Sequence, residues 1–162
     1  MTGDERREFV RTHRTAIFGY GRRHDGPSMT VVYYVMDGDD ILVSTMAERG
    51  KAKAVRRDAN VSICVLDEQW PPSYLLAYCK ARIVTEFEQV VDLRMRIAGV
   101  MAQQAIPESH RPFVAETSRK ENRVMLRLTP YATFETPPRH VAEPDDVKGL
   151  THWLGSTLPW NE

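Results

Sequence analysis

Three runs rich in β-branched and aromatic residues follow a short polar segment at the start of the chain. They span residues 15–22, 29–36 and 41–45, and the first two are separated by the turn-forming sequence His24-Asp25-Gly26-Pro27. A second turn, Asp37-Gly38-Asp39-Asp40, leads into the third run. Strands joined by short turns of this composition pair in antiparallel fashion. The pattern therefore predicts a three-stranded meander.

The remaining chain alternates between helical and strand patterns. The spacings Thr2/Glu5 and Thr85/Glu88 are typical of capping boxes, and each precedes a run of helix-forming residues. The apolar spacing after Thr85 predicts a helix of roughly five turns that Pro107 stops. Met95 and Met101 are expected on the buried face of this helix. The other elements that the pattern predicts are helices at 2–12, 48–57 and 112–119, and strands at 61–66, 74–84 and 123–130 with a weak continuation at 132–135.

These elements predict a mainly β, α+β fold. About six antiparallel strands with only two long insertions favour a small split β-barrel over a parallel, doubly wound sheet. The length of the strand at 74–84 suggests that it bends at a barrel corner. We expect one domain, with a split-barrel unit at residues 1–136 and its C-terminal tail at 137–162.

Composition narrows the possible functions. The 162 residues carry 22 Lys and Arg against 22 Asp and Glu, so a strongly basic nucleic-acid binder is disfavoured. No apolar run approaches the roughly 20 residues of a membrane span, and the charged N-terminus does not look like a secretion signal, which favours a cytoplasmic protein. Cys64 and Cys79 lie in strand-like runs, where buried free thiols are expected rather than a disulfide.

The usual catalytic and metal-binding motifs are absent from the sequence. It contains no G-x-S-x-G, H-E-x-x-H or C-x-x-C motif, and its five histidines are not spaced as metal ligands. Gly19-Tyr20-Gly21 falls inside a predicted strand and is a weak signal. We therefore expect no metal site and name no catalytic acid or base.

One segment has the composition of an anion-binding site. Ser44 and Thr45 end a strand, and the basic helix that follows begins with Arg49, Lys51 and Lys53. Hydroxyls, free backbone N–H groups and cations at a helix N-terminus favour a phosphate group. A structural alternative stays open, because Thr45 and Glu48 have capping-box spacing and a basic helix is often a solvated surface.

Six segments of the chain together match the pattern of a known family: Asp25-Gly26-Pro27, Tyr33-Tyr34, Asp37-Gly38-Asp39, Leu42-Val43-Ser44-Thr45, Arg49-Gly50-Lys51 and Arg56-Arg57-Asp58-Ala59-Asn60-Val61. With these segments the chain resembles the pyridoxamine 5'-phosphate oxidase-like split-barrel superfamily, and within it the flavin/deazaflavin oxidoreductases of the B type. The likeness covers residues 5–135 and is specific in 25–66, although Ala59 stands where such families often have Pro.

This resemblance implies a homodimer with its cofactor in a groove between the subunits. The matching positions imply that the phosphate is held at the end of the third strand and the start of the next helix, and that one face of the second strand lines the cofactor ring. The implied phosphate ligands are Ser44, Thr45, Arg49 and Lys51, with Lys53 nearby, and the implied ring-lining residues are Thr30 and Val32, with Tyr34 a further candidate. Trp70, in the loop before the long strand, is a candidate for stacking on ring or substrate, with packing or a dimer contact as the alternative.

Together these observations favour an oxidoreductase that uses reduced coenzyme F420 to transfer hydride to a small organic acceptor. FMN is the alternative cofactor. FMN oxidases of the superfamily tend to have further basic ligands on the next strand, and residues 61–66 offer none, whereas Lys53 and Arg56 suit an acidic cofactor tail. A non-catalytic carrier of flavin or haem and a cofactor-free dimer remain alternatives from other classes, and neither nucleic acid nor membrane is an expected partner.

Overall fold

The computed structural model describes residues 1–67, 69, 73–135 and 156–162 of the chain. Its strands are β1 (Thr15–Tyr20), β2 (Ser28–Asp37), β3 (Asp40–Met46), β4 (Asn60–Asp67), β5 (Ser73–Val84), β6 (Arg123–Glu135) and β7 (Ser156–Pro159). Its helices are α1 (Gly3–Thr12), α2 (Gly50–Arg57), α3 (Phe87–Ala102), the short 3-10 helix η1 (Glu108–His110) and α4 (Arg111–Lys120).

Six antiparallel strands form a closed barrel. The strand order is β3-β2-β1-β4-β5-β6-β7, and β3 also pairs with β6, which closes the sheet on itself. The long β5 changes register against β6 between Tyr78 and Cys79, so an irregularity accompanies its path around the barrel. The expected six-stranded split barrel of the α+β class is confirmed, while β7 was not predicted.

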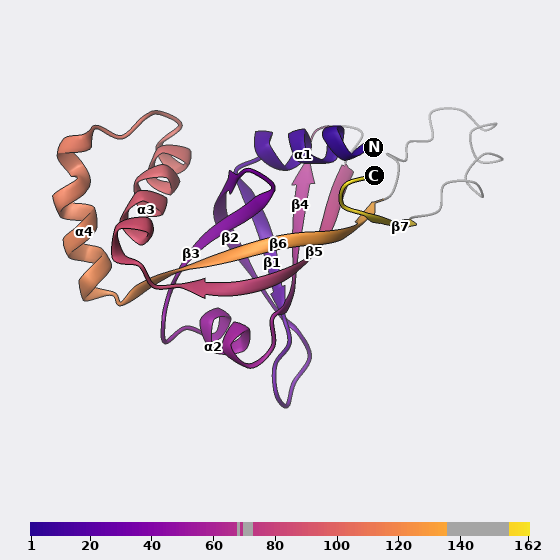
Figure 1. Ribbon diagram of the computed structural model, residues 1–162, viewed down its shortest axis with the longest axis horizontal. Coiled ribbons are helices and arrows are strands. Elements are labelled where there is room, and N and C mark those ends of the chain that lie inside the picture. The colour runs from indigo at the N-terminus through magenta and orange to yellow at the C-terminus, as the bar shows by residue number, and fades with distance from the viewer. Residues whose placement is uncertain (68, 70–72, 136–155) are drawn as a thin grey trace.

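The helices lie around the barrel in distinct places. Figure 1 shows α1 across one end, α2 at the opposite end, and the α3–α4 pair to one side. Side chains that alternate along the strands fill the interior, among them Phe18, Ile63 and Leu126, each fully buried. The Tyr34 hydroxyl donates a 2.6 Å hydrogen bond to the Val10 carbonyl and thereby joins β2 to the C-terminal part of α1.

Only the first of the three capping-box spacings forms such a box. Thr2 and Glu5 bond reciprocally at the start of α1. Thr45 instead lies within β3, paired with Val124 of β6, and its side chain is almost fully buried. Because the strand continues through it, Thr45 is too early in the chain to cap α2, so the Thr45/Glu48 box of the structural alternative does not form.

Helix α3 also begins and ends differently from the prediction. Its N-cap is Glu86, which makes no side-chain cap bond, so the expected box at Thr85 is wrong. The helix has 16 residues and ends where Gln103 adopts a left-handed conformation at φ 55°, well before Pro107. The helix is therefore shorter than the predicted five turns, because it ends early at its C-terminus.

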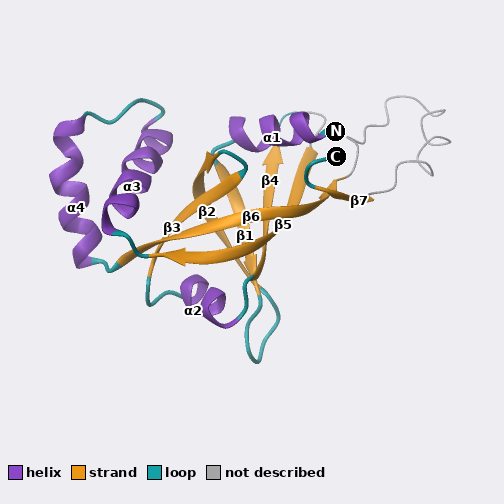
Figure 2. Ribbon diagram, viewed as in Figure 1, coloured by secondary structure: helices purple, strands orange, loops and turns teal. Residues whose placement is uncertain are grey.

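The last described segment returns to the barrel beside the N-terminus. Trp160 is 2% exposed and belongs to the main core, and its backbone N–H donates to the Tyr131 carbonyl at 3.2 Å. Arg6 of α1 donates to the carbonyls of Pro159 and Trp160 at 2.9 and 3.3 Å. The two ends of the chain consequently lie side by side (Figure 2).

Candidate functional site

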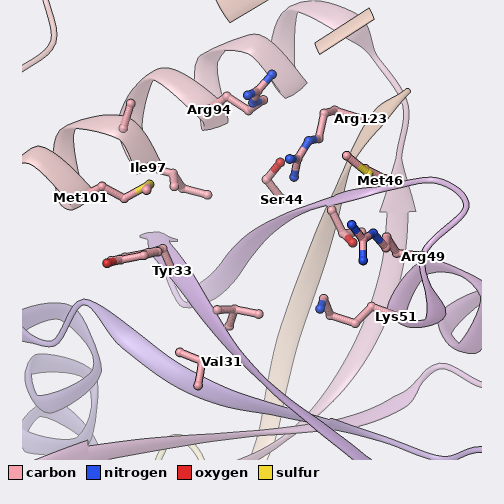
Figure 3. Close-up of a pocket in the computed structure, with 13 residues that line it drawn as sticks. Val31, Tyr33, Ser44, Met46, Arg49, Lys51, Arg94, Ile97, Met101 and Arg123 are labelled. Carbon is pink, nitrogen blue, oxygen red and sulfur yellow. The ribbon is translucent and has the colours of Figure 1, made fainter. Parts of the chain in front are cut away.

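A pocket of about 450 Å³ lies between β2 and α3 and extends to the start of α2. We call it the cationic pocket, and Figure 3 shows its side chains, with the cations gathered on one side and the apolar groups on the other. Its size is within the usual range for small-molecule sites. The lining residues are Val31, Val32, Tyr33, Ser44, Thr45, Met46, Arg49, Lys51, Arg94, Ile97, Ala98, Met101 and Arg123.

The start of α2 is left open to a ligand. Its N-cap is Arg49, whose side chain makes no cap hydrogen bond. The N–H groups of a first helical turn have no acceptor within the helix, and the helix dipole makes this end positive. Gly50 allows close packing here, because a Cβ at this position would lie 2.6 Å from the Tyr20 hydroxyl. The backbone and the cations at this helix start therefore favour an anion.

Lys51 extends from this turn into the cationic pocket. Its ammonium group donates a 2.9 Å hydrogen bond to the Thr30 hydroxyl of β2. Burial lowers the pKa of Lys51, and the neighbouring charges of Arg49 and Arg123 lower it further. These three cations repel one another, so an anion bound among them would be stabilised.

The hydroxyl of Ser44 provides a second indication of a ligand. Its Oγ is buried and has no hydrogen-bond partner among the described residues, and it lies beside the Arg123 guanidinium in Figure 3. A buried hydroxyl without a partner is unfavourable unless something bonds to it. This hydroxyl, the backbone N–H groups at the start of α2, the Lys51 ammonium and the Arg49 guanidinium together fit the phosphate of a flavin or deazaflavin.

The structure thus brings together four of the predicted phosphate ligands: Ser44, Thr45, Arg49 and Lys51 all line the cationic pocket. Lys53 does not. Its side chain is exposed and lies 3.8 Å from Glu48.

Arg56, expected to follow an acidic tail, instead donates to the Ala47 carbonyl at 2.8 Å. That bond ties α2 to the residue that follows β3, so the Arg56 guanidinium already has a structural partner.

The predicted ring-lining residues of β2 lie in different surroundings in the structure. Val32 lines the pocket but is only 7% exposed and belongs to the core, and Tyr34 is likewise buried. Thr30 serves as the acceptor for Lys51. Among the exposed side chains of this strand, Val31 and Tyr33 line the pocket, and both are labelled beside it in Figure 3. Trp70 lies outside the described residues.

Sequence reasoning missed the wall contributed by α3 and β6. Arg94, Ile97 and Met101 follow one another at helical spacing on α3, and Arg123 begins β6. Met101 is 55% exposed, so the expectation that it is buried with Met95 is wrong. The signal that was available is the i, i+3, i+7 spacing of a cation and two apolar residues on one helix face.

Cys79 is buried and Cys64 half-buried, and both thiols are free. Within residues 1–67, 69, 73–135 and 156–162, no three His, Cys, Asp or Glu side chains are grouped to hold a metal ion. No helix in the same ranges is long and apolar enough to cross a membrane.

Comparison with known proteins adds two findings. A family model described as pyridoxamine 5'-phosphate oxidase matches residues 2–136. No curated protein matches the chain in sequence.

Solved structures share the fold at low sequence identity. A conserved hypothetical protein from Mycobacterium tuberculosis is 21% identical, with a TM-score of 0.73 over 90% of this chain and 94% of that one. An F420 reductase is 16% identical, with a TM-score of 0.62 over 78% and 93%. An FAD-binding protein from Mesorhizobium loti is 12% identical, with a TM-score of 0.60 over 82% and 90%.

Proposed function

Because the chain belongs to the pyridoxamine 5'-phosphate oxidase family, we propose that it is an oxidoreductase that binds a phosphate-bearing flavin or deazaflavin in the cationic pocket. The observation that carries this proposal is the open start of α2, where Arg49 and Lys51 flank N–H groups that no side chain caps. A phosphate bound there would relieve the repulsion between these cations and gain charge-assisted hydrogen bonds.

The chain's own residues would bind and orient the cofactor. Lys51, fixed by Thr30, would hold the phosphate, while Val31 of β2 offers an apolar surface for the ring. When bound, a reduced deazaflavin supplies the hydride, so the protein needs no nucleophile of its own. This accounts for a pocket that contains cations and apolar groups but no histidine or carboxylate among its lining residues.

Among the candidate cofactors we propose coenzyme F420, with FMN as the alternative. The cations that line the pocket come from α2, α3 and β6, and β4 supplies none of them, unlike the pattern expected of FMN oxidases. A solved F420 reductase with the same fold is consistent with this choice. Transfer of hydride from F420 to a small organic acceptor is the resulting reaction class.

We further propose that the protein acts as a homodimer through the outside of its sheet. One outward row of apolar residues crosses four adjacent strands, each residue paired in register with the next. We call this row the outer apolar face, and it consists of Val31, Ile17, Cys64 and Leu76. The face is hollowed by about 440 Å³ around Ile17, Cys64 and Leu76. Val31 is 73% exposed and also lines the cationic pocket, so a second copy on this face would border the cofactor.

A parallel titration with F420 and with FMN, followed by fluorescence, tests the proposed function. We expect saturable binding of F420 that is tighter than binding of FMN, followed by oxidation of bound reduced F420 when an enone or quinone acceptor is added. Tighter binding of FMN would indicate that FMN, the alternative cofactor, is the one that the protein uses. Tight binding without turnover across acceptors would indicate a carrier, and binding of neither compound would refute the proposed site.

A further inference from the structure

The cationic pocket has a second group of charges, on the side formed by α3 and β6. Arg123 donates from its Nε to Glu121 at 2.6 Å, and the Nη2 of Arg94 lies 3.7 Å from the same carboxylate oxygen. Together these side chains place two guanidiniums around one carboxylate. One positive charge therefore remains uncompensated at this side of the pocket.

The two arginines have different surroundings. The Nη1 of Arg94 bonds the hydroxyls of Thr117 and Ser118 at 3.0 and 2.9 Å and thus holds α3 against α4. The Nη groups of Arg123 donate to no other described residue, and Figure 3 shows them turned toward Ser44 inside the pocket. Arg123 is therefore the guanidinium that is available to a ligand, and Arg94 and Glu121 position it.

An apolar surface lies beside this charge. Ile97 and Met101 are three and seven residues beyond Arg94 on α3, so all three share one helix face. Along the helix axis, Met101 lies about 10 Å from Arg94. Tyr33 of β2 lies opposite them in Figure 3. Met101 is 55% exposed and Tyr33 37%, which leaves both surfaces open to an apolar ligand.

We propose that the acceptor substrate is an apolar, planar molecule with a single carboxylate, which Arg123 binds while the apolar body lies between Met101 and Tyr33. This inference rests on the proposed function, since it assigns the substrate of the same pocket. A single carboxylate matches the one uncompensated charge that Glu121 leaves on the arginine pair. A guanidinium with both Nη groups free suits the two oxygens of that carboxylate.

Binding of a model compound to the cofactor-free protein tests the proposal without requiring turnover. Calorimetric titration compares 2-naphthoate with 2-naphthamide, which has the same ring system but no charge. We expect the wild-type protein to bind naphthoate about tenfold or more tightly than the amide. Arg123→Gln removes this preference, whereas Arg22→Gln, a matched loss of charge at an exposed turn, retains it.

Two further variants keep the proposal falsifiable. Lys51→Gln should weaken the binding of cofactor and leave the preference for naphthoate intact. Glu121→Gln removes the competing negative charge, so it should increase the preference several-fold, and it serves as the test if Arg123→Gln fails to fold.

Opposite results would overturn the inference and leave the proposed function testable by itself. Equal affinity of the wild-type protein for naphthoate and naphthamide would refute a carboxylate subsite. Loss of the preference in Lys51→Gln rather than Arg123→Gln would show that the acid binds at the start of α2. A loss of F420 affinity in Arg123→Gln as large as in Lys51→Gln, with the preference retained, would assign Arg123 to the phosphate.

Discussion

Replacing Lys51 by methionine tests the centre of the proposed cofactor site, and the same helix provides a matched control. Lys51 and Lys53 are two residues apart on α2, but their side chains have different surroundings. Lys51 points into the cationic pocket and bonds Thr30, whereas Lys53 is exposed and lies near Glu48. Lys→Met at either position removes one charge and keeps a side chain of similar length.

The expected loss follows from the kind of bond that Lys51 would make. A hydrogen bond between a charged donor and a phosphate contributes about 1.5–3 kcal/mol. Since each 1.4 kcal/mol corresponds to a tenfold change in the dissociation constant, Lys51→Met should weaken cofactor binding about 12- to 140-fold. Lys53→Met should change it by less than about threefold, because exposed charges interact weakly in water.

The cofactor-free protein should respond in a different way. Burial, together with Arg49 and Arg123, lowers the pKa of Lys51, so its charged form is disfavoured in the folded state. That penalty is present at neutral pH and disappears as the pH rises through the lowered pKa toward the ordinary 10.5. Lys51→Met should therefore leave the unfolding temperature without ligand unchanged or slightly raised, while reducing the increase that the cofactor causes.

Fluorescence titration and thermal unfolding, each with and without cofactor, measure both effects. Unchanged cofactor affinity in Lys51→Met would refute the reasoning, as would equal losses in Lys51→Met and Lys53→Met. A large fall in the unfolding temperature without ligand would instead indicate that Lys51 stabilises the fold, contrary to the direction of its pKa.

Three further changes test other parts of the structure. Met29 is 70% exposed on the outer side of β2, so Met29→Glu should convert a dimer to a monomer in sedimentation velocity. The control Phe113→Glu, at a 65% exposed position on α4, should leave the dimer intact. A wild-type monomer at micromolar concentration would refute the dimer. Gly50→Ala places a Cβ 2.6 Å from the Tyr20 hydroxyl and should weaken cofactor binding several-fold, and the added change Tyr20→Phe should restore it in the same titration. Tyr34→Phe leaves the buried carbonyl acceptor of α1 unpaired and should lower the free energy of unfolding by about 1–3 kcal/mol in urea denaturation; no change would show that this bond contributes nothing.

The sequence predicts the barrel well because the signals for its strands are local. The turns at 24–27 and 37–40 and the strand-forming residues between them specify β1, β2 and β3, and each strand has nearly the predicted bounds. The strand β7 was missed because its four residues carry no such pattern. Its position depends on contacts distant in sequence, chiefly the burial of Trp160 and the bonds from Arg6.

The meeting of α3 and β6 at the cationic pocket was missed for the same reason. Arg49 and Lys51 follow Ser44 within seven residues, so one segment shows both the hydroxyl and the cations. Arg94 and Arg123 come from different elements, and they meet only because α3 and α4 pack together and β6 closes the barrel against β3. Met101 was predicted on a buried face, but it is exposed. Helical spacing shows which residues share a face, but it does not show what covers that face.

The one local rule that fails beside the site is informative about function. Thr45 and Glu48 have the spacing that would close the start of α2, yet Thr45 remains paired in β3 and the N-cap Arg49 makes no side-chain bond. A capped helix would have its own acceptor for those N–H groups, and the cap would occupy the place of a ligand. Violations of local preference that nothing else in the fold compensates are expected where a site has been formed. The open helix start beside the unpartnered Ser44 hydroxyl is thus the part of this barrel that a bound phosphate would complete.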